Sequence, residues 1–256
     1  MKSPYILLFI ITFWAFSLLN AQENTTYPEN VNKLLNAYPE WITGYDGANL
    51  LMKDGSRIPY KETRPKPHPE LMNSEDIGDI FTYTYLKGEV KEIPENYDPG
   101  RIRSEKLLKK MYGETFAEVQ KNLVSITWCP KLVNQKLRVT SVNGIDKQLQ
   151  KVSDELDKHP ELKDYLKNAG TFNWRKVRGT NRLSSHSFGT AIDLNVKYSN
   201  YWQWDCRCTT EEADLKYRNR IPQLIVDVFE KHGFIWGGKW YHYDTMHFEY
   251  RPELLF

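Results

Sequence analysis

A carboxylate inside an apolar strand constrains this chain more than any other feature of its sequence. Residues 183–195 read LSSHSFGTAIDLN, and Asp193 lies in the strand predicted after Gly189. Side chains alternate along a strand, so Asp193 shares a face with Ala191 and Asn195, opposite an apolar face. A carboxylate in such a strand is costly unless it is paired or binds a metal ion. We therefore expect a partner for Asp193.

A second segment supplies matching chemistry. Residues 243–249 read YDTMHFE, in which His247 begins a short apolar strand and Asp244 lies three residues earlier. With His186, which precedes the glycine turn, the chain offers two imidazoles and one carboxylate. His186, Asp193 and His247 could form the ligand set of a catalytic zinc ion with water in the fourth position. Asp244, beside this site, could then take a proton from that water and give it to a leaving amine.

Other interpretations of these residues remain open. His186 could be a loop histidine, Asp193 could pair with a core arginine, and Asp244 could be a turn residue. His242 is a rival ligand, although a solvent-facing or supporting position is expected for it. Glu249 is a rival base, although a hydrogen bond that supports the site is expected of it. The other histidines are expected at the surface or at helix ends: His68, His159 and His232.

Several motifs resemble one known family in combination and in order. The pattern Ser-x-His-x-x-Gly-x-Ala-x-Asp at residues 184–193 and the closing Asp-x-x-His at residues 244–247 resemble the VanY-like D-alanyl-D-alanine carboxypeptidases of the M15 zinc metallopeptidase family. The stretches FNWRKVRGT at 172–180 and GFIWGGKW at 233–240 are also similar to that family. The resemblance covers residues 123–256 and is fainter at residues 98–101.

The resemblance implies roles residue by residue. It implies His186, Asp193 and His247 as zinc ligands and Asp244 as the general acid and base, although many relatives have Glu at that position. It implies that Arg175 polarises the scissile carbonyl or holds a substrate carboxylate, for which the bidentate geometry of arginine is suited.

Further residues are candidates for substrate binding. Arg178 is a basic neighbour of Arg175, and Ser184 lies two residues before the first proposed ligand. Trp236 and Trp240 are interpreted either as walls of a cleft or as core residues.

The implied function is hydrolysis of a peptide bond in bacterial peptidoglycan stem peptides, with removal of terminal D-Ala favoured. The alternatives are an endopeptidase that cuts L-Ala-D-Glu within the stem and a non-catalytic zinc-bearing cell-wall binding module. The formal net charge is only +2, from 35 Lys and Arg against 33 Asp and Glu, which argues against a general nucleic-acid binder. No stable protein partner is expected.

The first 21 residues are predicted to be a secretory signal peptide. Lys2 precedes an apolar run of about 15 residues, shorter than the ~20 needed to span a bilayer. The protein is therefore expected outside the cytoplasm of a bacterium, with a membrane attachment only if the signal is uncleaved. Such a compartment permits a disulfide from Cys129 to Cys206 or Cys208, whereas the last two are expected to be too close for an easy mutual bridge.

The order of elements predicts one compact α+β domain with a small antiparallel sheet flanked by helices, and the resemblance implies the D-Ala-D-Ala peptidase (hedgehog-type) fold. Residues 22–103 are predicted to be an irregular extension packed on the core, with a loose polar leader over 22–35, and residues 104–256 the catalytic domain. The predicted helices cover residues 104–113, 114–123, 145–156, 160–167 and 221–232. The predicted strands cover residues 124–128, 136–142, 171–178, 189–195, 234–236 and 246–250.

Overall fold

The computed structural model describes residues 27–256 except 61–65, 74, 91, 179, 209 and 211–213. The predicted signal peptide therefore lies outside the described residues. The helices are α1 (Glu29–Ala37), α2 (His68–Asn73), α3 (Glu105–Tyr112), α4 (Phe116–Lys121), α5 (Ile145–Leu156), α6 (Lys163–Leu166), α7 (Trp202–Cys206) and α8 (Gln223–Lys231). The strands are β1 (Ile42–Tyr45), β2 (Asn49–Met52), β3 (Arg57–Pro59), β4 (Leu123–Trp128), β5 (Gln135–Thr140), β6 (Ala191–Asp193), β7 (Phe234–Trp236) and β8 (His247–Tyr250).

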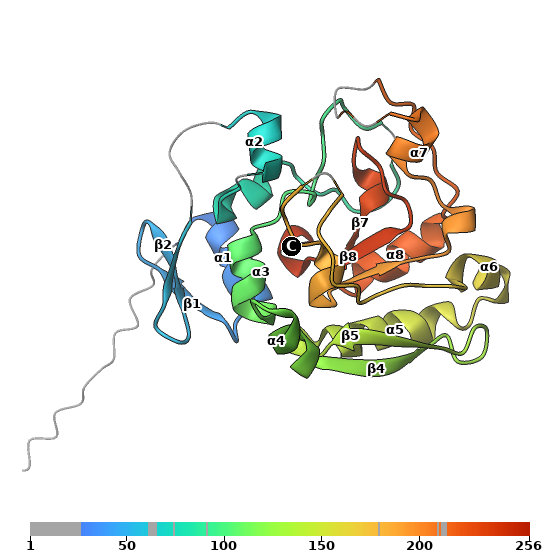
Figure 1. Cartoon of the computed structure of the whole chain (residues 1–256), viewed down its shortest axis with the longest axis horizontal. Coiled ribbons are helices and arrows are strands. Elements are labelled where there is room, and N and C mark those ends of the chain that lie inside the picture. Colours follow the sequence, from blue (N-terminus) through green and yellow to red (C-terminus); the bar gives the residue numbers. More distant parts are fainter. Residues whose placement is uncertain are drawn as a thin grey trace, which may run out of the picture.

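The strands form three small antiparallel sheets, with the orders β1-β2-β3, β4-β5 and β6-β8-β7 (Figure 1). Helix α8 packs against β7, and α5 packs against both β4 and α8. The mixed α/β architecture with small antiparallel sheets and helices confirms the predicted class at that level. Within the described residues no helix is both long and apolar enough to cross a membrane.

Aromatic stacking holds the sheet β6-β8-β7 on helix α8. The ring of Phe248, at the centre of β8, lies 4.0 Å from that of Phe229 on α8 and 6.2 Å from that of Trp236 on β7. All three side chains are at most 1 % exposed. This packing buries one face of β8, and neighbouring residues on the strand then point to the opposite face.

All the predicted helices occur, and the first two in the predicted order begin at side-chain caps. Ser104 accepts a hydrogen bond from the backbone N–H of Leu107 and begins α3, which ends at Gly113 with a φ of 120°. Thr115 and Glu118 form a capping box at the start of α4. These short polar residues bond backbone N–H groups that have no partner inside the helix, which is why they define the helix starts.

The prediction for the N-terminal region is wrong in part. Helix α1 occupies residues 29–35 of the expected loose leader, of which residues 22–26 lie outside the described part of the chain. Strands β1, β2 and β3 form a sheet where irregular structure is predicted. Each strand has only three or four residues, too few to show a clear period of two. The sequence signal that marks them is Asp-Gly at residues 46–47 and 54–55, where Gly47 and Gly55 have φ values of 97° and 82° at tight turns.

The strand predicted over residues 171–178 is also wrong, because this stretch contains only an isolated bridge between Lys176 and Leu183. Its backbone is held by irregular hydrogen bonds to residues 182–187 instead of by a neighbouring strand, and one side chain takes part. The Ser187 hydroxyl accepts a hydrogen bond from Arg175 N at 2.9 Å and donates to Arg175 O at 2.7 Å. The strand predicted over residues 189–195 shortens to β6.

The expected cysteine pairing is corrected as well. Cys206 and Cys208 form a disulfide, and Cys129 is a buried free thiol. The close spacing does not prevent the bridge because Arg207 adopts a left-handed backbone with a φ of 56°. This conformation places the two cysteine Cα atoms 5.2 Å apart, within the usual range for a disulfide.

The N-terminal residues share the main hydrophobic core with the C-terminal strands. Helix α1 packs against the 3₁₀ helix η7 (Pro252–Leu254), and Tyr38 donates a buried hydrogen bond of 2.6 Å to Glu253. Val31 and Leu34 of α1 belong to the same buried cluster as Phe248. Residues separated by more than 200 positions therefore stabilise one another.

Substitution of one core residue of α1 tests whether the N-terminal residues and the C-terminal strands unfold as one unit. Leu34 is 0 % exposed, so Leu34→Ala is expected to lower the free energy of unfolding by about 2–5 kcal/mol. Denaturant unfolding followed by circular dichroism should show one transition shifted as a whole. Asn36→Ala, on the exposed face of the same helix, is the control and should change stability by less than about 0.5 kcal/mol. Two separate transitions, of which only one moves, would contradict the shared core.

Candidate functional site

A tight turn at the end of a short 3₁₀ helix positions His186. This helix, η4, spans Ser185–Phe188 and ends at Gly189, whose φ is 68°. A Cβ at Gly189 would lie 3.0 Å from the backbone nitrogen of Thr140 and 2.7 Å from the side chain of Leu123, so only glycine fits. His186 Nδ1 lies 2.5 Å from the carbonyl oxygen of Thr171. A proton on Nδ1 donates to this carbonyl, which leaves Nε2 as the nitrogen that can bind a ligand.

The register of β6 and β8 brings the other two residues together. Asp193 and His247 are direct partners across the antiparallel pair. Directly opposed residues point to the same face of a sheet, so both side chains meet above it. Asp193 Oδ1 lies 3.0 Å from His247 Nδ1 and 3.1 Å from His186 Nε2. The two imidazole nitrogens are 3.2 Å apart.

These three donor atoms fit a zinc ion. His186 and His247 are 3 % and 6 % exposed, and the three atoms converge within one small volume. A tetrahedral zinc ion with bonds of ~2.0–2.2 Å separates its ligand atoms by roughly 3.3 Å. Two neutral imidazoles and one carboxylate are also a donor set that zinc accepts. The arrangement therefore matches such an ion in both spacing and chemistry.

The charges of the site stabilise one another. Burial opposes ionisation of Asp193, but His186 and His247 hold the pKa of its carboxyl well below the usual range. Burial likewise opposes protonation of His247, but hydrogen bonds with Asp193 and Glu249 raise its pKa to about 9. The Asp193 carboxylate thus favours positive charge on the two imidazoles beside it.

Asp244 lies beside these residues with a different environment. Its backbone N–H donates to Gly237 O at 3.0 Å, and a bridge to Tyr201 fixes the other side of the loop. Burial and the negative charge of Asp193 raise the pKa of Asp244 to about 7, against opposing charges that include Arg175. Among the described residues, no group hydrogen-bonds its buried Oδ1. This oxygen is therefore available for a group bound in the site.

The proposed substrate residues occupy different environments. Arg175 and Arg178 are exposed, and the charge of Arg175 acts on Asp244. Ser184 is buried, and its hydroxyl accepts from the backbone N–H of His186 at the start of η4. The ring of Trp240 lies 5.6 Å from that of His247.

Trp236 has the surroundings of a core residue. It is 1 % exposed and belongs to the main hydrophobic cluster, where its ring stacks on Phe248. Its indole Nε1 donates to the carbonyl oxygen of Thr245 at 2.9 Å. These contacts correspond to the core interpretation of this tryptophan.

Glu249 supports His247, as the alternation along the strand suggests. Its Oε2 lies 3.1 Å from His247 Nε2, on the side of the ring away from Asp193. The sequence interpretation missed Arg103, whose Nε donates to both oxygens of Glu249 at 2.7 and 3.0 Å. Arg251 NH1 lies 3.1 Å from the same carboxylate. The only feature of the sequence that points toward Arg103 is the faint family resemblance at residues 98–101.

Of the two positions expected for His242, the solvent-facing one is wrong, because its side chain is buried. His242 Nδ1 lies 2.7 Å from Asp98 Oδ2, and its backbone N–H donates to Asp98 Oδ1 at 3.0 Å. With His68, these residues form a second group that could hold a metal ion. Arg101 NH1 lies 3.0 Å from the same Asp98 oxygen, so a fixed cation already neutralises that carboxylate. The group at His186 is therefore the better candidate.

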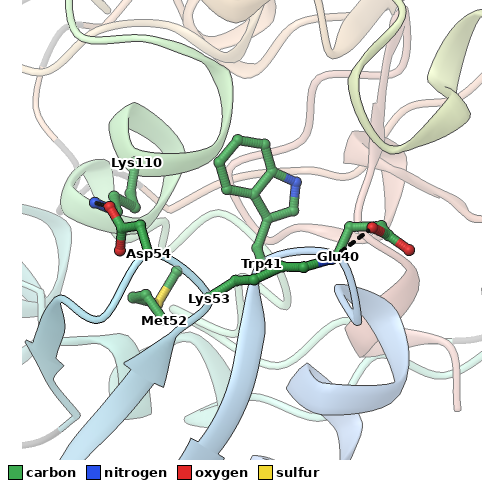
Figure 2. Close-up of a pocket in the computed structure, with 6 residues that line it drawn as sticks. All are labelled: Glu40, Trp41, Met52, Lys53, Asp54 and Lys110. Carbon is green, nitrogen blue, oxygen red and sulfur yellow. Dashed lines mark hydrogen bonds and ion pairs between the residues drawn. The ribbon is translucent and has the colours of Figure 1, made fainter.

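A separate cavity of about 270 Å³ lies between the N-terminal sheet and α3 (Figure 2). It is lined by Glu40, Trp41, Met52, Lys53, Asp54 and Lys110. Its charged side chains pair across the rim, with Lys53 3.1 Å from Glu40 and Lys110 bonded to Asp54. None of the proposed site residues lines this cavity, so it is not the candidate active site.

A comparison with known proteins finds a similarity in the segment around the site. Residues 178–250 match the model of an M15 peptidase family described as D-alanyl-D-alanine carboxypeptidase. Searches of the curated proteins and of the solved structures give no significant match. The matched segment contains His186, Asp193, Asp244 and His247, whereas Arg175 lies just before it.

Removal of one proposed ligand tests the metal centre. His186→Ala is expected to abolish stoichiometric zinc binding, because it removes one of three protein ligands from a buried site. Elemental analysis of purified protein after dialysis against zinc measures this loss, with circular dichroism to verify folding. His159→Ala, which removes a histidine beside exposed Glu161, should leave the zinc content unchanged. Equal zinc content in both variants would refute the ligand set.

Proposed function

From the M15 peptidase segment that this chain carries at residues 178–250, we propose that the protein is a zinc-dependent peptidase of bacterial peptidoglycan stem peptides, and specifically a D-alanyl-D-alanine carboxypeptidase. The observation that carries the proposal is the convergence of two histidines and one aspartate beside the buried, unbonded Oδ1 of Asp244. A purely structural metal site has no need of such an oxygen.

Three atoms would hold the metal: His186 Nε2, Asp193 Oδ1 and His247 Nδ1. When bound, zinc supplies Lewis acidity that makes water more acidic and polarises a carbonyl. Thr171 O and Glu249 fix the outward sides of the two imidazole rings, at 2.5 and 3.1 Å. Such contacts orient the rings and select the nitrogen that faces the metal.

Asp244 would move the proton. A carboxyl group with a pKa of about 7 can accept a proton from the attacking water and return it to the leaving amine near neutral pH. Its raised pKa arises from burial and from the charge of Asp193. The amine leaves as a free amino acid when the bond cut is the last one of the stem.

The exposed guanidinium groups suit a substrate that ends in a carboxylate. Arg175 acts electrostatically on Asp244, so a carboxylate or a developing oxyanion held by Arg175 would lie near the proton carrier. Arg178 would add positive charge at the entrance, while Ser184 and Trp240 would shape the inner wall. Trp236 would contribute to substrate binding only through the packing behind His247.

The remaining parts of the proposal concern architecture and location. We assign the D-Ala-D-Ala peptidase (hedgehog-type) fold to the catalytic domain at residues 104–256, with residues 22–103 as an extension packed on it. The signal peptide at residues 1–21 would direct the protein outside the bacterial cytoplasm, where its substrate lies.

Digestion of purified muropeptides tests the reaction. Pentapeptide stems incubated with the zinc-loaded protein are expected to lose one terminal D-Ala, seen by mass spectrometry as a tetrapeptide and free D-Ala. A chelator should stop the release, and added zinc should restore it. Cleavage between L-Ala and D-Glu would show the endopeptidase alternative, and binding of stems without any cleavage would show the non-catalytic module.

Substitution of the proton carrier separates metal binding from catalysis. Asp244→Asn is expected to retain zinc and to lower kcat by about 10²–10⁴-fold, because the amide cannot accept the proton. Steady-state release of D-Ala and elemental analysis are measured on the same sample. Asp227→Asn, on the exposed face of α8, is the matched control and should behave as the parent. A parental rate for Asp244→Asn would remove Asp244 from the mechanism.

A further inference from the structure

Residues 97–103, which read YDPGRIR, form a brace across the segment that carries the site. They precede the family match by more than 70 positions, yet they contact residues on either side of Asp244 and His247. The inference drawn from these contacts rests on the proposed zinc peptidase.

Backbone groups of the brace receive several hydrogen bonds. Tyr241 N donates to Tyr97 O at 3.0 Å, and Trp240 Nε1 donates to Pro99 O at 2.7 Å. Arg251 NH1 donates to Gly100 O at 3.0 Å. The brace thus contacts the chain both before Asp244 and after His247.

The brace also lies against β7 too closely for a side chain at its centre. Gly100 has a φ of 89°, and a Cβ there would lie only 2.2 Å from Ile235 Cδ1. Ile235 is 0 % exposed and cannot move away without displacing its neighbours. This close approach fixes the height of the brace above the sheet.

Two charged side chains of the brace, Asp98 and Arg103, extend toward the site. Asp98, which is 0 % exposed, accepts hydrogen bonds from the backbone and ring of His242, two residues before Asp244. Arg103 binds both carboxylate oxygens of Glu249, and its guanidinium lies 5.6 Å from the ring of Trp240. Asp98 holds the loop that carries Asp244, and Arg103 reaches Glu249, which contacts the proposed metal ligand His247.

The contacts of Arg103 continue through Glu249 to the ring of the proposed ligand His247. Arg103 Nε lies 2.7 Å from Glu249 Oε2, which lies 3.1 Å from His247 Nε2. The opposite nitrogen of that ring, Nδ1, lies 3.0 Å from Asp193. A carboxylate that is held by an arginine on one side can hold the imidazole only in one orientation on the other.

We propose that Arg103 is a positioning residue of the metal site, which acts through Glu249 to orient His247. Arg251 alone cannot replace it, because Arg251 contacts Oε1 whereas His247 contacts Oε2. Without Arg103, the oxygen that faces His247 loses its charged partner, and the carboxylate can rotate about its bond to the side chain. The peptidase site therefore extends to residues far upstream of the matched segment.

Zinc affinity, measured by competition with a chelator of known affinity, tests this role. Arg103→Gln is expected to weaken zinc binding by about 10–100-fold, the usual effect of removing a partner that orients a metal ligand. The visible spectrum of the Co²⁺-substituted protein should change as well, since it reports the geometry of the ligands. Arg103→Lys, which keeps the charge but not the two-oxygen contact, should recover part of the affinity.

Two controls separate positioning from general destabilisation. Arg57→Gln removes an arginine whose ion pair with Asp46 is at the surface, and Leu34→Ala lowers stability without removing a side-chain hydrogen bond or ion pair of the brace. Both should keep the parental zinc affinity and Co²⁺ spectrum. Parental affinity in Arg103→Gln, or an equal loss in either control, would overturn the proposal.

The remaining outcomes are also decisive. If Arg103→Gln does not fold, Arg103→Lys carries the test, and parental zinc affinity in that variant overturns the positioning role. A parent protein that binds zinc but cleaves no stem peptide contradicts the proposed reaction and leaves the Arg103 comparison intact, because affinity is measured with the metal alone. A parent that binds no zinc contradicts both proposals.

Discussion

The pairing of Asp193 with two imidazoles is the interaction on which the site depends. A partly buried carboxylate on an apolar strand is stabilised when positive or polar groups lie against it. The register between β6 and β8 places His247 opposite Asp193, and the left-handed turn at Gly189 returns His186 to the same face. The turn at Gly189 and the register of β6 and β8 therefore act together to place the three side chains side by side.

The same balance of charge recurs at Glu249, on the side of the His247 ring that faces away from Asp193. Glu249 is 1 % exposed, and its charge is balanced by Arg103 and Arg251 while His247 hydrogen-bonds it. Burial alone would raise its pKa, but these partners hold the pKa well below the usual range. Acidic and basic groups thus alternate from Arg103 through the imidazole to Asp193, and this alternation keeps several buried charges compatible with one fold.

The sequence predicts best what depends on local chemistry. Capping residues such as Ser104 mark the helices, and the spacing of His186, Asp193 and His247 suggests a ligand set that the structure brings within 3.0–3.2 Å. It predicts poorly what depends on distant partners. Irregular hydrogen bonds to residues 182–187, one of them from the Ser187 hydroxyl, hold the backbone around residue 175 where a strand is predicted. The pairing of Arg103 with a residue 146 positions away leaves no local pattern.

The residues that hold the site in place are spread over the chain, so the matched segment does not contain all of them. Residues 178–250 contain the proposed ligands and Asp244, but the groups that hold their surroundings come from outside it, including Asp98, Arg103 and Arg251. A metal ligand binds well only when its ring is already oriented, because otherwise the ordering of the ring offsets part of the binding free energy. The ligands alone therefore define the chemistry of the site, whereas the upstream brace determines how well that chemistry is organised.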